Sequence, residues 1–134
     1  MSVETLPKIF VCEDDPDIQI IIEMSLSDLG GANVTIFSSG AEFFAGLEND
    51  MPELVILDVM LPEMDGPTIL KKLKANDKYK HLPVIFMTAK IRPMDLADYK
   101  GLDVLGVIGK PFDPADVIDK IFDYWTNFKS SKLN

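Results

Sequence analysis

No apolar run in this 134-residue sequence approaches the roughly 20 residues that a membrane-spanning helix needs. The first residues also lack the basic stretch followed by a long apolar segment that marks a secretory signal. The only cysteine, Cys12, has no partner for an intramolecular disulfide, and its apolar surroundings indicate a small buried side chain. These absences together predict a cytoplasmic protein that makes no use of a membrane.

Positive charge is scarce as well. The chain has 13 Lys and Arg residues against 22 Asp and Glu, which gives a formal net charge of −9. Nucleic-acid phosphates are held by clustered basic residues, so we expect no nucleic-acid binding through this chain. With 47% hydrophobic residues and neither a repeat nor a linker, residues 1–134 are predicted to form one domain. Its core is expected at about 8–128, followed by a short, frayed polar tail at 129–134.

Five short runs of apolar and β-branched residues are predicted to be strands. They cover residues 8–12, 33–37, 54–57, 83–88 and 104–108. The run at 54–57 is apolar throughout, which is typical of a parallel strand that is covered on both faces. Longer segments with helical spacing of their apolar residues lie between these runs and after the last one.

The first helix is predicted to begin at Asp15 or Asp17, with Pro16 at an early helical position. Gly30-Gly31 is expected to end it. Its apolar residues recur at the spacing of one helix face, and they are Ile18, Ile21, Ile22, Leu26 and Leu29.

Three further helices have clear signals. One opens at Ser38 or Ser39, one follows the loop 62–66, and the last runs from 114 to about 128. Residues 91–100 have only a weak helical pattern. The apolar residues of the three clear helices are Phe43, Phe44 and Leu47; Ile69, Leu70 and Leu73; and Val117, Ile118, Ile121, Phe122 and Trp125.

The alternation of strands and helices predicts an α/β fold. It would be a doubly wound five-stranded parallel sheet with helices on both faces, because right-handed crossovers need covering helices. In such sheets, ligands bind beyond the carboxyl ends of the strands, near the point where the strand order reverses. The candidate functional residues are therefore those that end strands.

Four predicted strand ends have polar side chains that suit one site. Glu13 and Asp14 follow the first strand, Asp58 the third, Thr88 ends the fourth and Lys110 follows the fifth. Gathered carboxylates repel one another and lose hydration, which a divalent cation and an ammonium group would relieve. Mg²⁺ suits such a site because it takes hard oxygen ligands and keeps several waters.

These residue types fit phosphoryl transfer. An aspartate beside a bound cation stays ionised and can attack phosphorus, which forms an acyl phosphate. A cation held by few protein oxygens can also accept an oxygen of the incoming phosphoryl group. Thr88 would then hydrogen-bond one phosphoryl oxygen, and Lys110 would pair with another.

Each of these residues also has an ordinary structural explanation. The acidic residues 13–15 suit a helix N-terminus, where carboxylates offset the helix dipole. Asp58 would then be a turn residue, Thr88 a capping hydroxyl and Lys110 a solvated loop lysine. Their joint occurrence at four separate strand ends favours the functional interpretation.

With these residues in place, the sequence resembles the receiver domains of two-component response regulators over about residues 8–128. Four segments carry the resemblance: IFVCEDDPD at 9–17, VILDVMLPEMDG at 55–66, PVIFMTA at 83–89 and GVIGKPFDP at 106–114. Their order and spacing make the resemblance specific. It implies a flavodoxin-like fold.

The resemblance also implies roles for the strand-end residues. Asp58 would be the phosphoacceptor. Asp14 and Asp58 would bind Mg²⁺ directly, Glu13 would bind it through a water, and Met60 through its backbone carbonyl. The residues that would contact the phosphoryl group are Thr88 and Lys110.

Positions around the site have implied roles too. The Lys110-Pro111 peptide bond is expected to be cis, and Gly66 is expected to permit the loop geometry after the acceptor. Met60 and Lys90 would tune the lifetime of the acyl phosphate, with a surface Met and a solvated Lys as alternatives.

The implied phosphodonor is a sensor histidine kinase or a histidine phosphotransfer protein. Output is expected through contacts with a downstream protein target, since no effector segment follows Phe128. The chain would be a monomer or a weak phosphorylation-dependent dimer, and would catalyse only its own phosphorylation and dephosphorylation. Many receivers have an aromatic switch residue three positions before the lysine, but Val107 occupies that position.

Two other function classes compete. A pseudo-receiver would bind partners without phosphorylation, but it would have no need of the five residues at the strand ends. An aspartyl-nucleophile phosphohydrolase uses an Asp-x-Asp pair, whereas residue 60 is Met, and no cap domain encloses a substrate.

Overall fold

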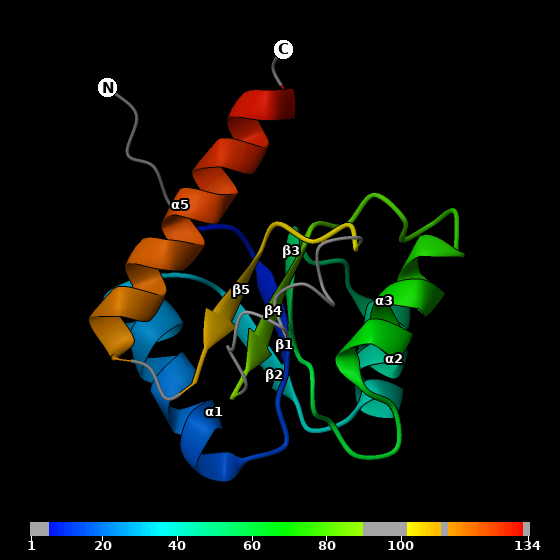
Figure 1. The fold of residues 1–134 in the computed structure, drawn as a ribbon, viewed down its shortest axis with the longest axis horizontal. Helices are drawn as coiled ribbons and strands as arrows, with labels where there is room; N and C mark the ends of the chain where they lie inside the picture. The colour runs from blue at the N-terminus through cyan, green and yellow to red at the C-terminus, as the bar shows by residue number, and fades with distance from the viewer. Residues whose placement is uncertain (1–5, 90–101, 111–112, 133–134) are drawn as a thin grey trace.

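The computed structural model describes residues 6–89, 102–110 and 113–132 (Figure 1). Its centre is a five-stranded parallel sheet in the order β2-β1-β3-β4-β5. The strands are β1 (Ile9–Cys12), β2 (Val34–Phe37), β3 (Leu54–Asp58), β4 (Val84–Thr88) and β5 (Gly106–Gly109). The predicted doubly wound α/β fold is confirmed.

Helices cover both faces of the sheet. Those described are α1 (Pro16–Ile22) with its continuation η1 (Glu23–Leu29), α2 (Gly40–Asn49), α3 (Gly66–Lys74) and α5 (Pro114–Lys132). Helices α1 and α5 lie on one side, and α2 and α3 on the other (Figure 1). The weak helical pattern at 91–100 lies outside the described residues. In the part of the chain that is described, no helix is both long and apolar enough to cross a membrane.

Two cores result, one on each face of the sheet. Alternate residues of a strand point to opposite faces, so Phe10 packs on the side of α2 and α3 while Val11 packs on the side of α1 and α5. All residues of β1, β3 and β4 are buried, which explains why these strands are apolar along their length. The sheet is therefore rigidly held at the three strands that end in candidate site residues.

The predicted start of α1 is confirmed in detail. Asp15 is the N-cap, and its Oδ1 accepts a hydrogen bond of 2.9 Å from the backbone N of Asp17. Pro16, whose missing N–H is not needed there, begins the helix. Ser39 caps α2 in the same way and accepts a bond from Glu42 N at 3.1 Å.

The second half of this first helical segment differs from the prediction. Residues Glu23–Leu29 form a π-helix, in which Gly30 N donates to Ser25 O five residues earlier. The wider turn rotates later side chains relative to an α-helix. Leu26 is fully buried, but Leu29 is 64% exposed, so its predicted place on the buried stripe is wrong.

Strand ends differ from the prediction by one residue in several places, and two boundaries differ by more. The last helix continues to Lys132, so the predicted frayed tail is wrong up to that residue. Of the apolar stripe predicted for this helix, Val117, Ile121 and Trp125 are buried, and Ile118 and Phe122 are half-buried. Strand β5 begins at Gly106 rather than at residue 104, because pairing with β4 starts where Gly106 lies opposite Ile85.

Candidate functional site

The carboxyl ends of four strands meet at one edge of the sheet. In the strand register, Cys12 lies opposite Leu57, Asp58 opposite Met87 and Thr88 opposite Gly109. The residues that end these strands or follow them directly are therefore brought together, as predicted. They are Glu13 after β1, Asp58 at the end of β3, Thr88 at the end of β4 and Lys110 after β5.

Lys110 connects two of the carboxylates. Its Nζ lies 2.5 Å from Oε1 of Glu13 and 3.1 Å from Oδ2 of Asp58. Glu13 is completely buried and Asp58 is 3% exposed, while the Lys110 side chain is 12% exposed. Lys110 is therefore not a solvated loop lysine. One ammonium partly neutralises two buried acids from different strands.

Backbone amides hold the remaining carboxylate oxygens. Asp15 N donates to Oε2 of Glu13 at 3.0 Å, and Met60 N donates to Oδ1 of Asp58 at 3.2 Å. In each acid, one carboxylate oxygen thus accepts a hydrogen bond from a backbone amide, and the other forms an ion pair with Lys110. This arrangement fixes the two side chains before any ligand arrives.

The charges of the site influence one another strongly. Burial raises the pKa of Glu13, and the nearby charge of Asp58 adds to this, although the hydrogen bond from Lys110 opposes it. For Lys110, burial on its own would lower the pKa. The hydrogen bonds and charges of Glu13 and Asp58 outweigh burial, so the pKa of Lys110 is raised.

Three carboxylates at this edge are close enough to share a cation. Oxygens of Glu13, Asp14 and Asp58 lie within 4.8 Å of one another, and Asp14 is exposed whereas the other two are buried. A hard, all-oxygen donor set of this kind suits Mg²⁺ better than a soft metal ion. Because the ammonium of Lys110 offsets only part of the negative charge, the residues present fit a divalent cation.

The other predicted residues have clear positions. Thr88 is fully buried, and its carbonyl accepts a 2.8 Å hydrogen bond from Lys110 N, which ties the end of β4 to the lysine. Met60 lies beside the acceptor with its residue surface 58% exposed. Lys90 and the Lys110-Pro111 peptide bond lie outside the described residues.

Gly66 has a more specific role than loop flexibility. A Cβ at this position would lie 2.8 Å from the carbonyl oxygen of Asp58 and 3.1 Å from Cα of Val59. The residue of this loop with a left-handed backbone is instead Glu63, at φ 66°. Gly66 is therefore required because the start of α3 approaches the end of β3 closely.

Two contacts of Gln19 and Tyr124 were not predicted from the sequence. Nε2 of Gln19 donates to Glu13 O at 2.6 Å and to Ser38 Oγ at 3.2 Å, which joins α1 to the ends of β1 and β2. The ring of Tyr124 lies over Gly106, where a Cβ would be 2.1 Å from the ring. A glycine inside a predicted strand was a usable signal for close approach of a neighbour.

This tyrosine does not replace the aromatic residue that is absent at position 107. Val107 packs in the core on the α2 and α3 side of the sheet, whereas Tyr124 packs on the α1 and α5 side. An aromatic ring does contact β5, but it comes from α5 and from the opposite face of the strand.

Cys12 lies below the acceptor in the core. Burial, followed by the charges of Asp58 and Glu42, raises the pKa of its thiol far above the ordinary value. The predicted small, buried side chain of Cys12 is confirmed, and a buried, protonated thiol is expected to be unreactive.

Comparison with known proteins gives relatives of one kind. Response regulator Rre1 from Synechocystis is 32% identical over 111 residues, which are 81% of this chain and 47% of that protein. Chemotaxis protein CheY-3 from Vibrio cholerae is 31% identical over 119 residues, which are 87% of this chain and 92% of that protein. This chain thus spans about half the length of the first relative and nearly all of the second.

Structural comparison agrees. The N-terminal domain of a response regulator receiver protein from Methanoculleus marisnigri has a TM-score of 0.71 at 30% identity, over 87% of this chain and 94% of that domain. The family model described as the response regulator receiver domain matches residues 9–122. This protein therefore belongs to the response regulator receiver domain family of two-component signalling.

Proposed function

We propose that this receiver domain accepts a phosphoryl group on Asp58 in a Mg²⁺-dependent reaction. The donor is a phosphohistidine of a sensor histidine kinase or of a histidine phosphotransfer protein. The observation that supports this most directly is the setting of Asp58. It is nearly buried, with one oxygen on the amide of Met60 and the other 3.1 Å from Lys110, at the edge that also presents Glu13 and Asp14.

In the proposed transfer, a carboxylate oxygen of Asp58 forms a bond to phosphorus. The bond between phosphorus and the donor imidazole nitrogen breaks, and its electron pair stays with the imidazole. Lys110, whose Nζ lies 3.1 Å from Oδ2 of Asp58, is proposed to pair with an oxygen of the transferred group, and the Thr88 hydroxyl is proposed to hydrogen-bond another. The protein contributes positioning and charge, and needs no separate general base.

Glu13, Asp14 and Asp58 are the residues proposed to hold Mg²⁺, with the Met60 backbone carbonyl as a further ligand. When bound there, Mg²⁺ supplies positive charge that offsets both the carboxylates and the incoming phosphoryl oxygens. Met60 is proposed to shield the acyl phosphate from water with its exposed side chain.

The proposed output is a contact with a downstream protein that depends on phosphorylation of Asp58. Apart from its own phosphorylation and dephosphorylation, the domain is proposed to catalyse no reaction. A phosphohydrolase would need an acid beside the nucleophile, and the thioether of Met60 cannot serve as one. The cytoplasmic location stays a prediction.

A direct test uses intact-mass analysis after incubation with Mg²⁺ and acetyl phosphate, which is a small acyl-phosphate donor. We expect one alkali-labile phosphoryl group on the wild-type protein and none on Asp58→Asn. Asp28→Asn is a matched control, because Asp28 is an exposed acid of η1, and this variant should be modified like the wild type. An unmodified wild type contradicts the proposal and leaves the pseudo-receiver, and an unchanged adduct on Asp58→Asn contradicts Asp58 as the acceptor. Repeated turnover of phosphate esters supports the phosphohydrolase.

A further inference from the structure

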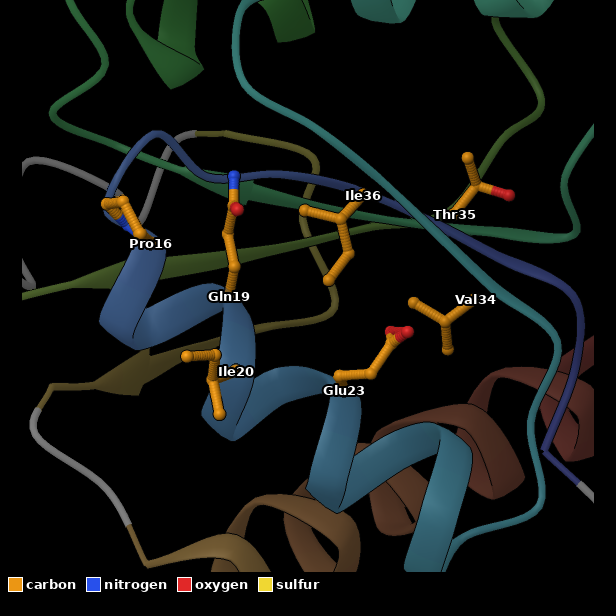
Figure 2. Close-up of a pocket in the computed structure, with 7 residues that line it drawn as sticks. All are labelled: Pro16, Gln19, Ile20, Glu23, Val34, Thr35 and Ile36. Carbon is orange, nitrogen blue, oxygen red and sulfur yellow. The ribbon is translucent and has the colours of Figure 1, made fainter.

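A groove of about 550 Å³ lies between α1 and β2, and Asp58 is not among the residues that line it. Its helical wall includes Ile20 and Glu23, and its strand wall is formed by Val34, Thr35 and Ile36. Figure 2 shows Val34 and Ile36 directed toward the helical wall and the carboxylate of Glu23 reaching toward Val34. Ile20 is 58% exposed although it is a large apolar residue, so an apolar strip is open to a partner.

The strand wall also has an open backbone edge. Strand β2 is an edge strand of the sheet, and no described strand lies beyond it. Asn33 O and Phe37 O accept hydrogen bonds from Ile9 N and Glu13 N of the neighbouring chain segment. Backbone groups alternate in direction along a strand, so those of Val34 and Ile36 point to the open side.

This edge lacks the usual protection. Natural edge strands are commonly blocked by a lysine, a proline or a bulge, because unpaired backbone groups are a template for another strand. Residues 33–39 contain no charged residue and no proline, and β2 pairs with β1 in an unbroken register. The edge is therefore suited to strand addition.

Charge indicates what kind of segment it accepts. Between Ile9 and Leu70 the sequence has 13 acidic residues and no Lys, Arg or His. This stretch includes α1, η1, β2 and α2, which are the elements at this end of the sheet. The acidic residues outnumber the basic ones at this end, and Glu23 places one carboxylate in the groove itself.

We propose that this groove binds an extended segment of a partner protein that alternates basic and apolar residues and adds to β2 as a further strand. Its backbone pairs with Val34 and Ile36, its apolar side chains pack between Ile20 and Ile36, and a basic side chain pairs with Glu23. A second copy of this chain is a poor occupant, because it would bring two acidic surfaces together in a protein of net charge −9. The groove has none of the residues proposed to hold Mg²⁺ or the phosphoryl group among its lining residues.

The test uses a synthetic probe, a capped peptide of alternating Lys and Val. Titrated into the ¹⁵N-labelled protein at physiological salt, it should shift the amide resonances of Val34 and Ile36 more than those of α3. A peptide of the same sequence with N-methylated backbone amides has the same charge but cannot pair with a strand. It should bind at least about tenfold more weakly, because its backbone can no longer donate hydrogen bonds to Val34 and Ile36. Equal binding of the two peptides overturns the proposal, since it would indicate charge attraction alone.

A matched pair of variants tests the position of the groove. Glu23→Lys should weaken binding of the Lys-Val peptide severalfold, whereas Glu48→Lys makes the same charge change on α2, outside the groove, and should have a much smaller effect. Equal losses overturn the proposal. Asp58→Asn should bind as the wild type does, which separates this site from the phosphoacceptor. Sedimentation of the free protein completes the test. If the free protein forms a dimer and Ile36→Pro dissociates it, a second copy of this chain occupies the edge of β2, and the proposal is overturned.

Discussion

Lys110, which follows β5, forms an ion pair with Glu13, which follows β1, and its Nζ lies 2.5 Å from Oε1 of Glu13. Glu13 is completely buried. The same ammonium reaches Asp58 at 3.1 Å. Lys110 therefore provides positive charge to both buried acids. A cation that binds these carboxylates has to share them with the lysine.

We predict that Lys110→Ala separates metal binding from phosphoryl transfer. Without the competing ammonium, Mg²⁺ should bind about tenfold more tightly, since a nearby unit charge is worth roughly 1–4 kcal/mol at effective dielectric constants between about 80 and 20. Phosphorylation by acetyl phosphate should nevertheless become slower, because the group that pairs with the phosphoryl oxygen is lost. Titration calorimetry and intact-mass time courses measure the two effects. Lys120→Ala, an exposed lysine of α5, should change neither. Weaker Mg²⁺ binding by Lys110→Ala would contradict this account.

The free energy of unfolding should fall in alkaline solution. The pKa of Lys110 is raised in the folded state above its ordinary 10.5, so its stabilising contribution is complete below pH 10.5 and is lost as the pH rises through the folded value. The pKa of Cys12 is also raised, so the unfolded thiol ionises first and stability falls as the pH rises above 9.0.

Urea unfolding from about pH 8 to about pH 11 measures this loss, with the slope between 9.0 and 10.5 assigned to Cys12 and the steeper part to Lys110. Cys12→Ala should flatten the whole interval above 9.0, because the folded thiol stays protonated throughout it, whereas Lys110→Ala should flatten only the part above 10.5. A wild-type stability that does not change over this interval would be inconsistent with both shifts.

Two glycines should respond differently to alanine. Gly66→Ala places a Cβ 2.8 Å from the carbonyl oxygen of Asp58, so the acceptor loop must move, at a cost of about 1–3 kcal/mol. Phosphorylation of Asp58 should slow with it. Gly31→Ala meets no neighbouring atom, but its φ of +69° costs about 1 kcal/mol. Its phosphorylation rate should stay at the wild-type value. Thermal unfolding and intact-mass kinetics distinguish the two, and equal rates for both variants would show that Gly66 does not support the acceptor.

The π-helix predicts unequal roles for two leucines three positions apart. Leu26→Ala removes a fully buried side chain and should lower the free energy of unfolding by about 2–5 kcal/mol. Leu29 is 64% exposed, and Leu29→Ala should change it by less than about 0.5 kcal/mol. Urea denaturation measures both. Comparable losses would indicate an ordinary α-helix that buries both side chains.

Much of the site follows from the sequence because parallel strands are regular. Once apolar runs locate strand ends, the fold brings Glu13, Asp58, Thr88 and Lys110 to one edge without knowledge of any side-chain contact. Helix starts were equally accessible, since the caps at Asp15 and Ser39 depend on neighbours within a few residues.

What the sequence did not predict depends on packing between distant segments. The exposure of Leu29 follows from a change of helical pitch that an apolar stripe does not reveal. The bridging by Gln19 requires the ends of β1 and β2 to be adjacent, and the ion pair of Lys110 with Glu13 requires two loops from opposite ends of the chain. The spacing of residues along the chain does not predict which distant segments come into contact.

The burial of Cys12 has a practical consequence. The chain has one thiol, which lies inside the sheet and stays protonated, so a thiol reagent reaches it only when the sheet opens. The rate at which a thiol reagent modifies Cys12 then measures how often the region beneath the acceptor opens, and no engineered probe is needed. Mg²⁺, phosphorylation and bound peptides can be compared on that one scale. A cysteine introduced at the surface can be labelled selectively, because the buried Cys12 does not react with the label.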